Sequence, residues 1–211
     1  DYQYFGGIDN MDTLKAEKRD MSTKAKRLRR EGYVTGNVFG HAIKGSIPVK
    51  IEKKDAERLF KTKKKGSQIM LDVDGQQMDV LVKEIDYNPV KGQLEEIDFQ
   101  ALVSGEAVHS VAEVVLKNEA KVVGGVVELI LEEISYKAVP SEMIETVEID
   151  VGDMKPGDVL KVADLPIASN KNIHLKTDPE AVVVSVVAPK SADVPDDEEA
   201  DGDEKDAKAS K

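Results

Sequence analysis

Short β-branched runs that alternate apolar and polar residues constrain the fold of this 211-residue chain most strongly. The run "SIPVKI" puts Ile47, Val49 and Ile51 on one face of an extended segment, and "IETVEIDV" at 144–151 repeats the pattern. A period of two residues is typical of a strand that is buried on one side. The chain is therefore predicted to be mainly β.

Further strands and one tight turn follow from local composition. The stretch "IMLDVDGQQMDVLVKEI" predicts a hairpin, because Asp74 and Gly75 supply the turn residues between two apolar runs. The runs "YVTGNVFG", "LEEIDFQAL" and "AVVVSVV" predict further strands, while "DYNPVKGQ" at 86–93 predicts a loop. Gly124 and Gly125 indicate either a turn or a close backbone approach.

Two helices are expected in the first half of the chain. Residues 22–31 form the first, with Ser22 as its N-terminal cap and Gly32 as its left-handed end. The second, in "KDAERLFKTKKKG", spaces Ala56, Leu59 and Phe60 as one helical face and is expected to end at Gly66.

The composition divides the chain into four parts. Residues 1–10 form an extension of unclear origin, and Met11 is expected to be the true start. Residues 11–102 and 103–190 are predicted to form two β-rich domains. Residues 191–211 contain one valine and no other large apolar side chain, so this acidic tail is predicted to be disordered.

Charge is distributed unevenly over these parts. The whole chain has a formal charge of −11, yet residues 11–102 carry 19 Lys and Arg against 15 Asp and Glu. Five cations occupy the seven positions from Lys24 to Arg30, and a second group spans Lys61 to Lys65. Each group is either a solvated helix surface or a site for a polyanion. For the group from Lys24 to Arg30, the Arg side chains favour a polyanion site, since guanidinium groups bind phosphate well.

The sequence argues against catalysis. It contains no cysteine, so it has neither disulfides nor thiolate metal sites, and its three histidines lack metal-ligand spacing. Phosphate-loop, dinucleotide and nucleophile-elbow motifs are missing as well. We expect no catalytic residue, cofactor, metal or small-molecule substrate. With no run of 18 apolar residues, we expect no membrane segment and a cytoplasmic protein.

Several longer stretches resemble one known family. "LKAEKR", "KRLRREG", a strand ending in "VFG", and "VDGQQMDVLVKEIDYNPVKGQLEEIDF" resemble the 5S rRNA-binding domain of bacterial large-subunit ribosomal protein number twenty-five. "GGVVELILEEISYKAVPSEMIETVEIDVGDMKPGDVLKVADL" and "DPEAVVVSVVAP" resemble the C-terminal domain of its long form, the Ctc general stress protein type. The resemblance covers residues 14–190.

The resemblance implies a fold and a site. It implies a small N-terminal β-barrel with about two helices that binds loop E of 5S rRNA, followed by a second β-rich domain. The partners it implies are 5S rRNA and the large ribosomal subunit. Carried over position by position, the resemblance marks Arg19, Lys26, Arg27, Arg29 and Asp98 as RNA-binding, and Phe39 stands at a family tyrosine. With the neighbouring cations Lys24 and Arg30 these form the predicted RNA-binding set.

The chain departs from the family pattern at several of these positions. Glu96 stands where the family has a histidine, Phe39 replaces a tyrosine, and Asp20 lies beside Arg19 in a shortened loop. Both carboxylates would repel phosphate. These departures leave an alternative open: a stress-related protein-interaction module that has the same fold, works off the ribosome and binds RNA weakly.

Overall fold

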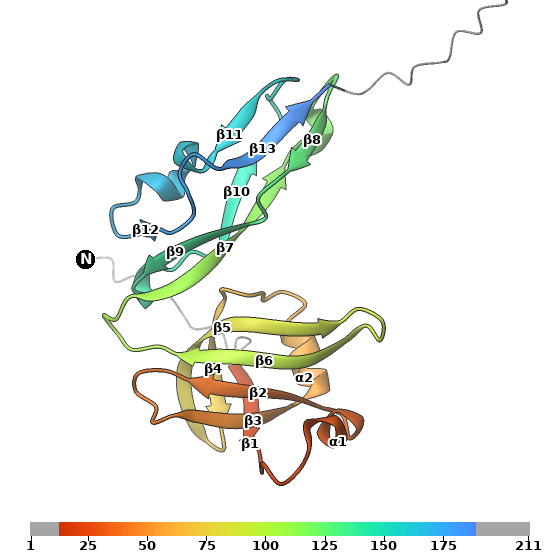
Figure 1. Cartoon of the computed structure of the whole chain (residues 1–211), viewed down its shortest axis with the longest axis vertical. Helices are drawn as coiled ribbons and strands as arrows, with labels where there is room; N and C mark the ends of the chain where they lie inside the picture. Colours follow the sequence, from red (N-terminus) through yellow and green to blue (C-terminus); the bar gives the residue numbers. More distant parts are fainter. Residues whose placement is uncertain (1–12, 189–211) are drawn as a thin grey trace, which may run out of the picture.

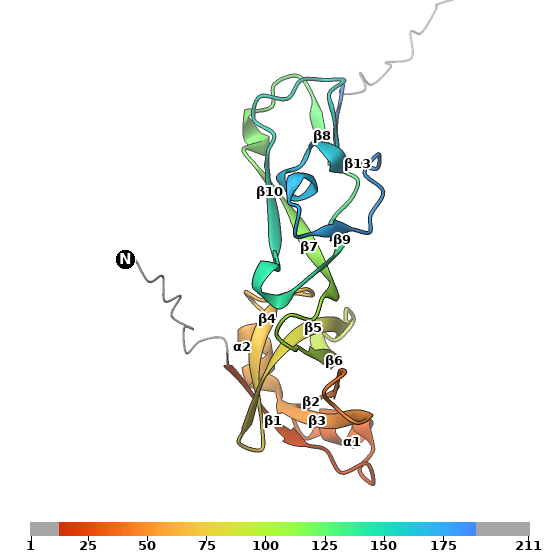
Figure 2. The same ribbon diagram turned by 90° about the vertical axis from the view of Figure 1, so that its left-hand side faces the viewer.

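The computed structural model describes residues 13–188, which form two lobes stacked along the long axis of the molecule (Figures 1 and 2). The first lobe is a β-barrel and the second is built from two smaller sheets. The mainly β prediction is therefore confirmed. The predicted extension at 1–10 and the predicted acidic tail at 191–211 lie outside the described residues.

Six strands close the barrel in the order β1-β3-β2-β6-β5-β4. Two neighbouring pairs, β1 with β4 and β2 with β6, are parallel, and the other described pairs are antiparallel. The strands are β1 (Thr13–Lys18), β2 (Tyr33–Phe39), β3 (Ser46–Glu52), β4 (Gln68–Val73), β5 (Gln76–Asn88) and β6 (Gln93–Ala101). Closure removes the exposed sheet edges on which other chains pair.

The predicted hairpin joins β4 to β5. Asp74 and Gly75 have φ angles of 52° and 87°, as a two-residue turn with positive φ at both positions requires. The loop predicted at 86–93 is shorter than expected. β5 continues to Asn88 and β6 begins at Gln93, because Tyr87 and Asn88 still pair with Leu94 and Gln93.

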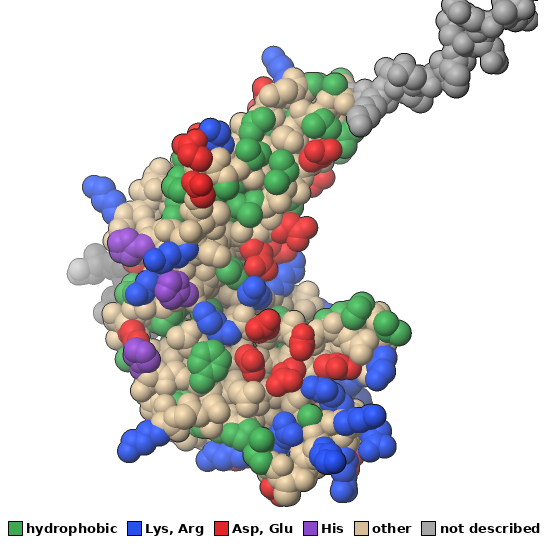
Figure 3. All heavy atoms as spheres, in the orientation of Figure 1, with side chains coloured by type: hydrophobic (Ala, Val, Ile, Leu, Met, Phe, Trp, Pro, Cys, Tyr) green, Lys and Arg blue, Asp and Glu red, His purple; other side chains and the backbone are tan. Residues whose placement is uncertain are grey.

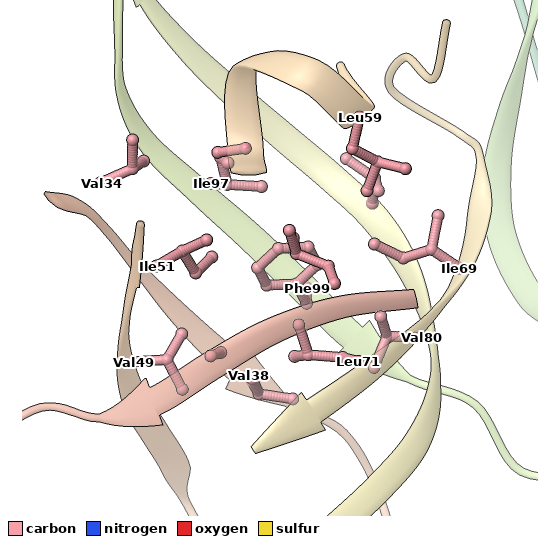
Figure 4. Packing of buried hydrophobic residues seen from close by; sticks show 14 of the residues in the cluster. Val34, Val38, Val49, Ile51, Leu59, Ile69, Leu71, Val80, Ile97 and Phe99 are labelled. Atoms are coloured by element: carbon pink, nitrogen blue, oxygen red, sulfur yellow. The ribbon is translucent and has the colours of Figure 1, made fainter. Parts of the chain in front are cut away.

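The barrel core is apolar and surrounds Phe99, which is fully buried (Figure 4). The short helix α2 (Lys53–Leu59) adds Ala56 and Leu59 to this core. The prediction that this helix ends at Gly66 is wrong, because its last helical residue is Leu59. Gly66 instead has a φ of 87° at the junction with the second lobe.

The second lobe contains a four-stranded sheet, β10-β7-β9-β12, and a three-stranded sheet, β11-β13-β8. The fully buried Tyr136 lies between them in a core of Val, Ile and Leu side chains, and its hydroxyl bonds both the N–H and the carbonyl of Ile144. The strands are β7 (Val108–Lys117), β8 (Val126–Leu129), β9 (Glu133–Ala138), β10 (Thr146–Asp150), β11 (Val159–Lys161), β12 (His174–Leu175) and β13 (Val182–Val187). Four 3-10 turns connect them: η1 (Glu119–Lys121), η2 (Pro140–Glu142), η3 (Val162–Asp164) and η4 (Pro166–Ser169).

Both alternatives for the paired glycines occur, one at each residue. Gly124 has a φ of 76° and forms the turn. Gly125 allows a close approach, since a Cβ atom there would lie 2.5 Å from the side chain of Val186. The glycine pair thus turns the chain and lets β8 begin tightly against β13.

Carboxylates of the second lobe meet the lysine-rich segment after α2. Glu145 accepts hydrogen bonds from the Ser67 hydroxyl at 3.4 Å and the Gln68 amide at 3.3 Å, and it pairs with Lys63 at 3.4 Å. Two further ion pairs cross the junction, Lys64 with Glu113 and Lys65 with Glu133. The two lobes are thereby held together by polar contacts.

Candidate nucleic-acid interface

The short helix α1 (Ala25–Arg30) carries most of the predicted site and lies on the outside of the barrel (Figure 1). Leu28 is the buried residue that attaches it, and Gly32, with a φ of 93°, ends it as predicted. The predicted start is wrong. The helix begins at Ala25, because the Ser22 hydroxyl bonds Asp20 instead of capping a helix.

Arg29 differs from the other cations of α1, because it binds the barrel. Its Nε donates to the carbonyl of Glu95 at 3.0 Å, and its Nη2 lies 3.3 Å from Glu96 Oε2 and 3.4 Å from Thr35 Oγ1. With its side chain 30% exposed, Arg29 fixes one face of the helix onto β6. Glu96, which a sequence-based argument treats as repelling phosphate, is neutralised here by Arg29.

The remaining cations of α1 are exposed. Within residues 13–188, the side chains of Lys24, Lys26 and Arg30 form no hydrogen bond or ion pair. Arg27 pairs with Glu31 at 2.8 Å, and this partner raises the pKa of Arg27. An exposed pair of this kind contributes little stability, so Arg27 remains able to exchange Glu31 for another anion. Figure 3 shows Lys and Arg side chains gathered on this end of the barrel.

Arg19 lies where β1 leads into the loop before α1. Its Nη2 donates to the carbonyl of Thr23 at 3.0 Å, and its buried Nε has no hydrogen-bond partner among the described residues. In the same loop, hydrogen bonds from Ser22 lower the pKa of Asp20. Arg19 therefore supports the loop that sets the position of α1.

The outer face of β2 and β6 carries the other two predicted residues. The strands run in parallel with Asn37 opposite Asp98 and Phe39 opposite Gln100, and the Asn37 amide donates to Asp98 at 3.4 Å. The ring of Phe39 is half-buried. The neighbouring strand β5 adds Glu84 and Asp86 next to Asp98 and Glu96, so carboxylates border the cationic helix (Figure 3).

The second lysine group has a role that neither sequence-based alternative described. Instead of a free phosphate site or a solvated helix end, Lys63, Lys64 and Lys65 pair with Glu145, Glu113 and Glu133 of the second lobe. Sequence reasoning missed this junction because the partners are separated from the lysines by 49 to 82 positions.

Residues 13–188 contain neither a metal-binding cluster nor a membrane-spanning helix. Among residues 13–188, no three His, Asp or Glu side chains are grouped closely enough to hold a metal ion. The same residues include no helix with the length and hydrophobicity needed to cross a bilayer. His41 pairs with Glu106 at 2.7 Å, while His109 and His174 lie on strands that flank β9.

Comparison with known proteins agrees with the fold. Residues 14–99 match the model of the Ribosomal L25p family, and residues 107–190 match that of the ribosomal protein TL5, C-terminal domain. A "Large ribosomal subunit protein bL25" from Bacillus velezensis is 32% identical, over 90% of this chain and 94% of the relative. Its namesake in Bacillus pumilus is 33% identical, over 88% of this chain and 90% of the relative.

The two matches define a two-domain ribosomal protein whose parts correspond to the barrel and the second lobe. The chain belongs to the bL25 family of the large ribosomal subunit. Its role is structural and non-enzymatic, and ribosomal proteins of this kind are found in the cytoplasm. The family resemblance and the expectation that the chain is not an enzyme are both confirmed.

Proposed function

We propose that this ribosomal protein binds 5S rRNA at loop E, and that α1 is the main contact. The observation that carries the proposal is a short helix that Arg29 clamps onto a rigid barrel. Its exposed cations Lys26 and Arg30, and Lys24 directly before it, have no partner within residues 13–188. Phosphate contacts are made by such cations, and a fixed orientation lets them meet a structured RNA rather than any polyanion.

The eight predicted residues divide into three roles under this proposal. Contact with phosphate is assigned to the exposed cations Lys24, Lys26, Arg27 and Arg30. Arg19 and Arg29 are positioning residues, because each is hydrogen-bonded within the protein. Phe39 and Asp98 lie on the adjoining face of β2 and β6, where a half-buried ring and a carboxylate held by Asn37 suit contact with the minor groove of a helical RNA.

Salt-dependent binding tests the proposal. In the variant Lys26→Gln/Arg30→Gln, two phosphate contacts are lost, so the log–log slope of affinity against salt should fall by about 1.4–1.8. The matched control is Lys54→Gln/Lys91→Gln, which removes two exposed barrel cations that have no ion pair among the described residues. An unchanged slope in the first variant, or an equal fall in both, would show that α1 is not the interface.

Sedimentation distinguishes this function from an off-ribosome role. Wild-type protein should migrate with large subunits at moderate salt, and Lys26→Gln/Arg30→Gln should shift part of it into the free pool. A wild-type protein found only in the free pool would contradict the 5S rRNA proposal.

A further inference from the structure

A row of cationic and imidazole side chains crosses the four-stranded sheet of the second lobe. His109 on β7 lies directly opposite Lys137 on the neighbouring strand β9, and Lys137 lies at the register position next to His174 on β12. Both histidines are exposed and Lys137 is half-buried. Figure 3 shows His and Lys side chains gathered at the left of the junction between the lobes, away from α1.

Two further lysines join this row from other parts of the chain. Lys176 follows β12, and its backbone amide donates to Ser135 at 2.8 Å, which fixes it beside β9. Lys83 belongs to the barrel strand β5, and its ammonium donates to the carbonyl of His109 at 2.7 Å across the junction. Both domains therefore contribute cations to the same surface.

These cations lie close enough to influence one another. Partial desolvation lowers the pKa of the exposed His109, and so do the positive charges of Lys176, Lys137 and Lys83. Burial likewise lowers the pKa of Lys83, together with the charge of Lys65. No carboxylate is among the groups that shift either residue, although Lys65 on the same surface is paired with Glu133.

A small hollow opens on this surface at the junction. Its volume is about 140 Å³, and its polar lining consists of two lysines, one histidine and two serines from both lobes: Lys65, Lys83, His109, Ser110 and Ser135. Ser110 is only 6% exposed, and within residues 13–188 its hydroxyl has no hydrogen-bond partner of ordinary geometry. Burial raises the pKa of Tyr136, and the nearby Ser110 hydroxyl partly opposes that rise. Ammonium, imidazole and hydroxyl donors in one hollow form the donor set that binds a phosphate oxygen.

The members of the row that do not line the hollow also lack partners within the described part of the protein. Within residues 13–188, the side chains of Lys137, His174 and Lys176 form no hydrogen bond or ion pair. Among the other lysines of this lobe, Lys117 is paired with Glu148 and Lys161 with Glu180, whereas Lys155 and Lys171 have no ion pair within the described residues. Like charges that gather without carboxylates cost folding free energy, and a bound polyanion offsets that cost.

We propose that the junction hollow holds a phosphate group of an RNA backbone, and that the row of His109, Lys137, His174 and Lys176 contacts the neighbouring phosphates. This junction site is separate from α1 and needs both domains in contact. The identification of the bound polyanion as rRNA rests on the proposed function. Free phosphate has the same chemistry, but an extended row of cations suits a chain of phosphates better than a single ion.

The test uses the full-length chain and the complete rRNA of the large subunit, 5S rRNA included. Lys137→Gln/Lys176→Gln removes two cations whose side chains form no hydrogen bond or ion pair within residues 13–188. Lys155→Gln/Lys171→Gln is the control, because it removes two other exposed lysines of the same lobe that have no ion pair among the described residues. We expect the salt slope of RNA binding to fall by about 1.4–1.8 in the first variant and to stay unchanged in the second.

Three other outcomes overturn the junction site. If Lys26→Gln/Arg30→Gln lowers the slope and Lys137→Gln/Lys176→Gln does not, RNA binding by α1 stands and the junction site fails. In a parallel NMR titration with inorganic phosphate, shifts of the His109 and Ser110 amides without any effect of the variants on RNA binding would identify a site for a free anion only. If neither variant changes the slope, the proposed function fails as well.

Discussion

A Cβ atom at Gly66 in the barrel would lie 2.1 Å from the carbonyl oxygen of Val111 in the second lobe. The two backbones therefore touch at a point where only glycine fits. The same residue has a φ of 87°, which disfavours any side chain, and its amide donates to the carbonyl of Val82 at 2.9 Å. Gly66 thus connects the conformation of the loop after α2 to the docking of the second lobe.

Replacing Gly66 by alanine should separate the lobes. Gly75→Ala is the matched control, because Gly75 also has a φ of 87° but a Cβ atom added to it would meet no other atom within 4 Å. The left-handed backbone costs each variant about 1–2 kcal/mol, and only Gly66→Ala must also displace Val111. We expect faster proteolysis of the segment at 103–107 and a larger radius of gyration for Gly66→Ala alone. Equal behaviour of the two variants would contradict the close packing.

Glu145 should contribute more to the junction than the exposed ion pairs do. It accepts bonds from Ser67 and Gln68 besides pairing with Lys63, so Glu145→Gln should lower the free energy of unfolding by about 1 kcal/mol. Glu148→Gln, which loses only an exposed pair with Lys117, should cost about 0–0.5 kcal/mol. Urea denaturation measures both values, and a smaller loss for Glu145→Gln than for Glu148→Gln would refute the ranking.

Arg29 should act on RNA binding through position rather than charge. Because its guanidinium is bound to Glu95 and Glu96, Arg29→Ala should weaken binding to 5S rRNA while leaving the salt slope within about 0.5 of wild type, less than one phosphate contact. Arg29→Lys should not restore affinity, since an ammonium cannot bridge both acceptors in the same geometry. A fall in the slope of about 0.7–0.9 in Arg29→Ala would make Arg29 a direct phosphate contact.

Phe99 and Phe39 provide a contrast between core and surface. Phe99 is completely buried at the centre of the barrel (Figure 4), so Phe99→Ala should cost about 3–5 kcal/mol of unfolding free energy. Phe39 lies half-buried on the outer face, so Phe39→Ala should cost about 1 kcal/mol and act mainly on RNA binding. Thermal unfolding of both variants tests this contrast, and similar losses would contradict it.

The strands could be predicted because their cause is local. Alternating apolar residues, as in Val49 and Ile51, determine which face is buried, and the Asp74–Gly75 pair determines a turn. The start of α1 could not be predicted, since the Ser22 hydroxyl can either cap a helix or bond Asp20 two residues before it, and the local sequence allows both. The same holds for Gly66, which is typical of a helix end but is needed for contact with Val111, far along the chain.

The candidate site shows the same limit. A run of cations predicts a cationic surface, but it does not distinguish Arg29, which binds the barrel, from Lys26, which does not. The lysines after α2 and the row through His109 depend on pairing between distant segments. A local excess of cations therefore indicates a cationic surface, but it does not indicate which of its side chains are bound within the protein.

Acidification should strengthen RNA binding at the junction site. In the free protein the pKa of His109 is lowered by partial desolvation and by Lys176, Lys137 and Lys83, with Lys65 and His174 also nearby, which disfavours its imidazolium form. A phosphate beside it favours the imidazolium and raises this pKa on binding. Affinity should therefore rise as the pH falls from about 7.5 to about 6.

The free protein should respond in the opposite sense. Because the folded state lowers the pKa of His109, the unfolded chain binds the proton more readily, and this contribution reduces stability as the pH falls below the unfolded pKa. His109→Asn should flatten both dependences, whereas His41→Asn, which changes a histidine paired with Glu106 on the barrel side, should leave the binding profile unchanged. The measurement is RNA affinity at fixed salt across this pH range. If the affinity of His109→Asn depends on pH as steeply as that of wild type, no phosphate lies in the hollow beside His109.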